Sequence, residues 1–251
     1  MQSSREIRCL KVGEIKLWKA ELTYGVDFDV RVTAPIFVYL IRSGRELTLV
    51  DAGFRPNRAA RINNSARGTL QLLQSALRRL SVEPDDIRNL VLTHLHTDHS
   101  AFIGKFKRAR LFVQSKEVEF ARNPLPTQAP FYDSDILETL EKSDAELIDG
   151  DKNLSDGIRL IHTPGHTPGS QSVSVKLDKS EFVICGDTIP MYHNWYPSRR
   201  RFGTAVALPR IPPAIHSDLN EWFRSCQKLD DVSGTMIPSH DPLLEDGAAF
   251  R

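Results

Sequence analysis

The chain has 251 residues, 40% of them hydrophobic, and a formal net charge of +1, which argues against a dedicated nucleic-acid surface. Its longest apolar run, residues 34–41, is far too short to span a bilayer, and residues 1–11 lack the apolar core of a signal peptide. We therefore expect one domain, residues 1–251, in a cytoplasmic protein with no nucleic-acid partner and no membrane partner.

The first half of the chain predicts two strands followed by helices. Residues 37–41 and 47–50 are apolar, strand-like runs separated by a Ser-Gly turn. Residues 57–80 predict a helix, because their leucines recur at intervals of three and four residues. Residues 83–86 resemble a helix start, and residues 115–120 begin another short helix. These signals indicate a sheet-rich scaffold with helices on the outside.

Four residues of metal-ligand type follow the apolar stretch at residues 90–93. They form the run His-x-His-x-Asp-His, made of His94, His96, Asp98 and His99. Side chains two apart on an extended chain point the same way, so His94 and His96 can converge on one cation. His99 can reach a second cation only if the chain turns just before it. Neutral imidazole and carboxylate ligands suit zinc and its first-row neighbours.

Three further candidate ligands stand where apolar strands run into loops. His166 lies in a loop with two Pro-Gly pairs, Asp187 ends a strand, and His240 follows another. His162 competes with His166, but it closes a strand and is expected to pack or hydrogen-bond locally. The seven donors suffice for two divalent metal ions that share one carboxylate and one hydroxide. Zinc is the first choice of metal, with iron, manganese or cobalt as alternatives.

Several other residues carry weaker signals. Asp51, at the end of an early strand, could orient a ligating histidine or form a turn. Cys9, Cys185 and Cys226 have no paired spacing and are expected to be buried fillers, although strand parity could turn Cys185 towards Asp187.

Two segments near the C-terminus leave alternatives open. Residues 191–196 are aromatic and precede Arg199–Arg201. They form either the wall or lid of a pocket or a solvated loop whose aromatic residues pack on the core. The three arginines form either a carboxylate or phosphate clamp or an ordinary exposed basic run. A helix at residues 218–229 is expected to use its apolar face for core packing.

The chain resembles the metallo-β-lactamase fold superfamily and, within it, the N-acyl homoserine lactone lactonases. The resemblance extends from about Ala34 to about Pro242 and is carried by the histidine run, by Thr-Pro-Gly-His-Thr-Pro-Gly-Ser-Gln-Ser-Val and by Pro-Ser-His-Asp-Pro. It implies an α/β (α+β) fold, the four-layer αβ/βα sandwich, in which helices flank two mixed β-sheets.

The resemblance also implies how the ligands divide between two metals. One metal would be held by His94, His96 and His166, the other by Asp98, His99 and His240, and Asp187 would bridge them. Lactonases of this group carry a tyrosine three residues after the bridging aspartate, and this chain has Pro190 there. Tyr192 is the nearest phenol that could orient the substrate carbonyl.

The expected reaction is the opening of a lactone ring, of an N-acyl homoserine lactone or a related lactone, by metal-activated hydroxide. Asp98 or Asp187 would relay the proton, and Tyr192 or His193 would donate to the oxyanion. No Gly-x-Ser-x-Gly motif is present, consistent with the absence of a protein nucleophile. A small-molecule lactone or ester is the expected partner, and homodimer formation is left open.

Three alternatives remain at this point. The same site could serve an esterase, thioesterase, phosphotriesterase or β-lactamase. It could belong to a di-iron redox protein, which would use a flavin partner domain, or it could be an inert metal site in a structural or binding protein.

Overall fold

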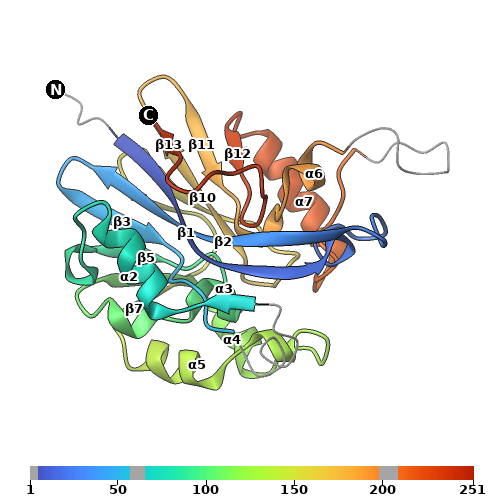
Figure 1. The fold of residues 1–251 in the computed structure, drawn as a ribbon, viewed down its shortest axis with the longest axis horizontal. Helices are drawn as coiled ribbons and strands as arrows, with labels where there is room; N and C mark the ends of the chain where they lie inside the picture. The colour runs from blue at the N-terminus through green and yellow to red at the C-terminus, as the bar shows by residue number, and fades with distance from the viewer. Residues whose placement is uncertain (1–4, 57–65, 198–208) are drawn as a thin grey trace.

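The structure is a computed structural model, and it describes residues 5–56, 66–197 and 209–251. Its described strands form two sheets, drawn in Figure 1. The first sheet has the order β13-β1-β2-β3-β5-β6-β7, and β4 also pairs with β1. Its strands are β1 Arg5–Trp18, β2 Arg31–Ser43, β3 Glu46–Val50, β4 Ala66–Gly68, β5 Asn89–Val91, β6 Arg110–Gln114, β7 Ala145–Ile148 and β13 Ala249–Phe250.

The second sheet is smaller and has the order β12-β11-β10-β9-β8. Its strands are β8 Lys152–Ser155, β9 Ile158–His162, β10 Gln171–Lys176, β11 Glu181–Ile184 and β12 Thr235–Ile237. Both sheets are mixed, because β3, β5, β6 and β7 run parallel in the first and β11 and β12 in the second, while the remaining pairs are antiparallel.

Helices cover the outer faces of the two sheets. The α-helices are α2 Leu70–Arg78, α3 Thr97–Ser100, α4 Ser115–Arg122, α5 Ser134–Glu141, α6 Tyr192–Trp195 and α7 Leu219–Asp230. In Figure 1, α2, α4 and α5 lie on one side of the molecule, and α6 and α7 lie on the other. Short 3-10 turns span Lys19–Glu21, Pro84–Asp86, Ile103–Lys105, Ala129–Phe131 and Gly186–Thr188. None of the helices in the described ranges has the length and apolar character needed to cross a membrane.

Strand β2 explains how the layers are held together. Its alternate residues Val38 and Leu40 pack into the core under the helices, while Tyr39 and Ile41 pack into the core between the sheets. A strand buried on both faces needs apolar residues at every position, which accounts for the apolar run at residues 34–41. A third cluster, between the second sheet and α7, includes Trp222. The four-layer α+β arrangement predicted from sequence is therefore confirmed.

The predicted strands at residues 37–41 and 47–50 lie within β2 and β3, and the helices predicted from residues 115 and 218 are present as α4 and α7. The helix predicted over residues 57–80 is wrong at its start. Residues 57–65 lie outside the described ranges, residues 66–68 pair with β1 as a strand, and α2 begins only at Leu70. Thr69 stops the helix from extending backwards, because its side chain accepts a hydrogen bond from Leu72 N as an N-cap.

Candidate metal centre

The predicted turn in the histidine run is a short helix. After β5 the chain bends at Thr93, is extended at His96 and then enters α3, where His99 N donates to the carbonyl of His96 at 3.0 Å. The turn moves His99 away from the direction of His94 and His96 and brings it to the neighbouring group of ligands. The six residues from His94 to His99 therefore contribute side chains to both groups of the site.

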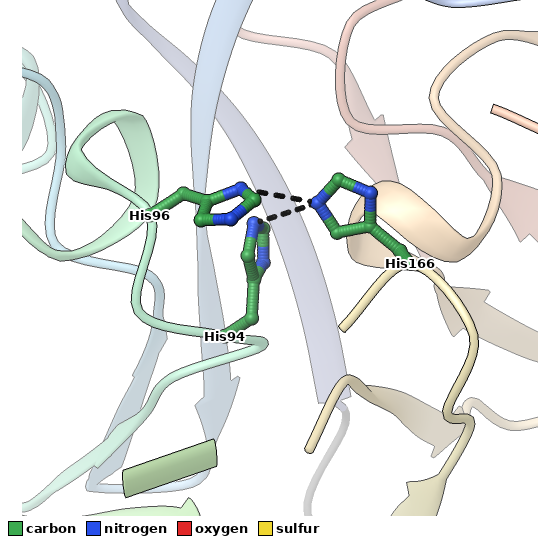
Figure 2. Close-up of side chains that lie close together, drawn as sticks. All are labelled: His94, His96 and His166. Atoms are coloured by element: carbon green, nitrogen blue, oxygen red, sulfur yellow. Dashed lines mark hydrogen bonds between the residues drawn. The ribbon is translucent and has the colours of Figure 1, made fainter. Parts of the chain in front are cut away.

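Three histidines meet at one point, as Figure 2 shows. Nε2 of His166 lies 3.3 Å from Nε2 of His94 and 3.1 Å from Nδ1 of His96, and all three side chains are buried. Two nitrogens bound to one tetrahedral zinc at 2.0–2.1 Å stand about 3.3 to 3.4 Å apart. The spacing of the three imidazoles thus matches that of ligands around a single small cation.

A second group forms beside the first from Asp98, His99 and His240. Oδ2 of Asp98 lies 3.6 Å from Nε2 of His99 and 3.5 Å from Nε2 of His240. Asp187 stands between the two groups. Its Oδ2 lies 3.5 Å from Nε2 of His166, while its Oδ1 lies 3.3 Å from Nε2 of His99 and 3.0 Å from Nε2 of His240. One carboxylate therefore faces both groups, each with a different oxygen.

Hydrogen bonds on the far side of three rings point their Nε2 atoms inward. Nδ1 of His99 lies 2.8 Å from the carboxylate of Asp51, that of His166 lies 2.7 Å from the carbonyl of Ile215, and that of His240 lies 3.0 Å from the carbonyl of Pro35. A carbonyl or carboxylate can only accept, so each Nδ1 carries a hydrogen, and in the neutral form of each ring the lone pair is on Nε2, which faces the centre. These are the tautomers that bind metals through Nε2.

The electrostatics of the centre fit a bound cation. Burial lowers the pKa of His94 and of His96 well below the usual value, so both rings are neutral, the form in which imidazole binds a metal. Burial would also lower the pKa of His99, but the carboxylates of Asp98, Asp187 and Asp51 outweigh it and raise that pKa well above normal. The buried Nε2 of His99 has no hydrogen-bond partner within the described chain. The centre therefore attracts positive charge at the position where a cation would stand.

Two residues singled out by sequence lie around the ligands rather than among them. Asp51 contacts His99 and also accepts from Thr93 N at 2.8 Å and from Thr93 Oγ1 at 3.0 Å, as expected for a residue that orients a ligand. Nε2 of His162 lies 3.0 Å from the carbonyl of Pro168, which confirms its predicted local role. Cys185 is buried in the core under α7.

A cavity of about 680 Å³ opens onto the centre. His96, Asp98, Asp187 and His240 are among the residues that line it. Apolar side chains from the β1 and β2 hairpin and from later loops form much of its wall: Ile15, Leu17, Leu22, Ala34, Ile36, Phe54, Phe131 and Ile215. The sequence motifs do not indicate this hairpin wall, because its residues stand far from every ligand in the chain.

Tyr192 is placed differently from the metal ligands. It begins α6, its backbone N–H donates to Oδ2 of Asp241 at 2.7 Å, and it is not among the described residues that line the cavity. The carbonyl of Pro190, at the position of the missing tyrosine, accepts from His240 N at 2.8 Å. His193 lies 3.9 Å from Asp27 through Nε2. Arg199–Arg201, for which the sequence left open a clamp or an exposed basic run, lie outside the described ranges.

The sequence of the chain is similar to those of known proteins. Residues 32–240 match the family model of the metallo-beta-lactamase superfamily. An N-acyl homoserine lactonase of a Bacillus species is 32% identical over 175 residues, which span 65% of this chain and 65% of that relative's length. The N-acyl homoserine lactonase AttM of Azorhizobium caulinodans is 27% identical over 96% of this chain and 92% of its own.

A solved structure shares the fold over nearly its whole length. It is an N-acyl homoserine lactone hydrolase with the product N-hexanoyl-L-homoserine bound at its catalytic metal centre. The superposition has a TM-score of 0.79 at 21% sequence identity and covers 97% of this chain and 95% of that structure. The order and packing of the layers are therefore those of a known hydrolase scaffold.

Proposed function

The chain belongs to the metallo-β-lactamase superfamily, as its motifs predicted, and on that premise we propose that it is a single-domain, metal-dependent hydrolase that opens lactone rings. The observation that carries the proposal is the position of Asp187. Its two oxygens face two adjoining groups of proposed ligands, and Asp187 itself lines an open cavity. N-acyl homoserine lactones and related lactones are the proposed substrates, because relatives over 96% and over 65% of the chain are lactonases of that class.

The proposed ligands divide as the geometry suggests. His94, His96 and His166 would hold one metal, Asp98, His99 and His240 the other, and Asp187 both. We propose zinc, since imidazole and carboxylate donors suit it and no thiolate is involved, with iron, manganese or cobalt as alternatives. When bound, two such cations lower the pKa of water and polarise a carbonyl oxygen.

The chain's own residues would handle the proton. Lactone hydrolysis adds the oxygen of water to the carbonyl carbon and breaks the ring C–O bond, which leaves a carboxylate and a hydroxyl group. The water loses two protons in all: one passes to the leaving oxygen, and the other is released to solvent when the new acid ionises. Asp98 suits this transfer, because its side chain lines the cavity and is 19% exposed, against 10% for Asp187. Asp187 also accepts a hydrogen bond from Ser239 Oγ at 2.6 Å.

The cavity wall suits an acyl substituent. Apolar side chains of the hairpin, such as Ile15, Leu17 and Ile36, adjoin the ligand end. An acyl chain that leaves water for this wall would gain about 0.8 kcal/mol per buried methylene. We therefore expect activity to rise with acyl-chain length until the wall is filled. Cytoplasmic location remains a proposal, consistent with three buried free cysteines.

A substrate panel tests the proposal. The zinc-loaded protein would be offered N-acyl homoserine lactones of increasing chain length, simple γ-lactones, a thioester, a phosphotriester and a β-lactam, and acid release would be followed with a pH indicator. We expect the lactones to be opened with the highest kcat/KM. Preferred cleavage of another class, with the lactones left intact, would rule the lactonase assignment out. The variant His94→Ala serves as the inactive control.

A further inference from the structure

Glu117 is a buried carboxylate that belongs to none of the sequence motifs and has no role in the proposed reaction. It lies in the first turn of α4 and is 0% exposed. A carboxylate removed from water is costly unless several donors stabilise it. The function of Glu117 can be inferred from where its hydrogen-bond donors lie in the fold.

Three side-chain and backbone donors converge on Glu117. Leu95 N donates to its Oε1 at 2.9 Å and Tyr132 Oη donates to the same oxygen at 2.9 Å, while Thr167 Oγ1 donates to Oε2 at 2.5 Å. Burial raises the pKa of Glu117, and the hydrogen bonds from Thr167, Leu95, Tyr132 and the backbone of Gly169 oppose that rise. The carboxylate is therefore the acceptor at the centre of a small buried network.

The donors come from the loops that hold the three histidines. Leu95 stands between His94 and His96, and Thr167 follows His166 directly. Tyr132 packs edge-on against His96, with ring centroids 4.7 Å apart. A single carboxylate thus ties together two loops that are about 70 residues apart in the chain and that supply all three ligands of one group.

The second group of ligands has a different buried carboxylate. Asp51 contacts His99 directly at 2.8 Å and reaches the first group through Thr93, whose Oγ1 lies 3.2 Å from Nδ1 of His94. The hydrogen bonds of Glu117 within the described chain do not involve Asp98, His99, His240 or a residue beside them. Glu117 therefore supports the first group alone, whereas Asp51 contacts the second directly and the first through Thr93.

We infer that Glu117 is a positioning residue that sets the metal affinity of the three-histidine group and leaves the other group nearly unaffected. This inference rests on the ligand division of the proposed function. Glutamine at this position has one acceptor oxygen in place of two, so the side chain can no longer accept from both loops. Loss of a residue that orients ligands lowers metal affinity by about 10- to 100-fold.

The test is a metal titration that needs no substrate. Metal-free wild type and Glu117→Gln would be titrated with zinc against a competing chelator, and bound metal would be counted by elemental analysis. Wild type should bind two zinc ions. In Glu117→Gln, the affinity for one zinc ion should fall by about 10- to 100-fold, while the affinity for the other stays within about threefold of wild type. At a suitable chelator concentration the variant should therefore hold one zinc where wild type holds two. Far-ultraviolet circular dichroism of each protein checks the fold.

Two further variants make the result decisive. Glu119→Gln changes an exposed residue of the same helix and should titrate as wild type does. Thr167→Val removes one donor from the network and should weaken the same step by a smaller factor; it also carries the test if Glu117→Gln does not fold. Equal weakening of both steps, or no change in either, would overturn the inference.

The titration separates this inference from the proposed function. A wild type that binds two zinc ions with one step sensitive to Glu117, yet opens no lactone, would overturn the substrate assignment alone. A wild type that never binds a second zinc would overturn both.

Discussion

Asp51 holds His99 by a 2.8 Å contact between its Oδ2 and Nδ1 of the ring, and it does so from a left-handed backbone conformation with φ of 65°. Asparagine, like aspartate, tolerates that conformation better than most other non-glycine residues. Asp51→Asn should therefore keep the loop but remove the charge, and we expect metal affinity at the Asp98 and His99 group and kcat/KM to fall by about 10- to 100-fold.

Metal counting after dialysis and lactone kinetics would measure the effect of Asp51→Asn. Asp178→Asn, an exposed substitution in the turn between β10 and β11, is the matched control and should be neutral. Full metal content together with wild-type kinetics in Asp51→Asn would show that the contact does not orient the ligand.

Asp98→Asn tests the proposed proton transfer. The amide has nearly the same shape as the carboxylate and can still place an oxygen near His99 and His240, but it cannot accept a proton from water. We expect kcat to fall by about 10²- to 10⁴-fold, the contribution of positioned acid-base groups. Because Asp98 is also a proposed ligand, metal content must be measured in the same sample. A variant with two metals and wild-type kcat would remove Asp98 from the mechanism.

Tyr192→Phe should have little effect. The phenol is not part of the described cavity lining, and the hydrogen bonds of Tyr192 to Asp241 and from Tyr196 both use its backbone. Deleting the hydroxyl should leave kcat/KM for a lactone within about threefold of wild type, since that factor corresponds to less than about 1 kcal/mol. A fall of more than about tenfold in kcat with unchanged KM would instead restore the oxyanion role predicted from sequence.

The sequence could predict that the proposed ligands lie together, and the structure brings them close. For His94, His96 and His99 the signal is local, because they stand within six residues of one another. The sandwich could be predicted only through resemblance, since nothing local specifies how the two sheets pair. The buried run in β2 was visible as apolar sequence, but its division between two cores depends on what packs against each face.

Glu117 shows why the rest of the site could not be predicted. In sequence it is a polar residue of a short helix and would be expected on the surface. Its burial is caused by Tyr132 and by the loop at Thr167, 15 and 50 residues further along the chain. The predicted start of α2 was wrong for a similar reason. Residues 66–68 pair with β1 as a strand, although their sequence continues the helical periodicity.

The three cysteines should resist modification in the folded protein. Burial raises the pKa of Cys9 and of Cys226 to about 12 and raises that of Cys185 as well. Since the thiolate is the reactive form, reaction with a disulfide reagent at pH 8 should be slower than for a free thiol by on the order of a thousandfold. We expect less than one thiol per chain to react in minutes, and three after denaturation. Rapid reaction of one thiol in the native protein would contradict the packing around it.

Gly169 lies in the loop that carries His166, at the point where this loop packs against α4. Its contact with Glu117 leaves no room for a side chain. A Cβ built on Gly169 would lie 2.2 Å from the backbone nitrogen of Glu117 and 2.4 Å from its Cα. Gly169→Ala must therefore push the loop away from α4, which we expect to cost about 1 to 3 kcal/mol and to lower Tm by roughly 2 to 10 °C. In Gly104→Ala, the matched control, the new Cβ would meet only a side-chain methyl of Thr139 at 3.1 Å, so the loss should be smaller. Because the displaced loop carries His166, zinc should also be lost first from the three-histidine group. A Gly169→Ala variant with the Tm and zinc content of wild type would contradict the close packing of this loop against α4.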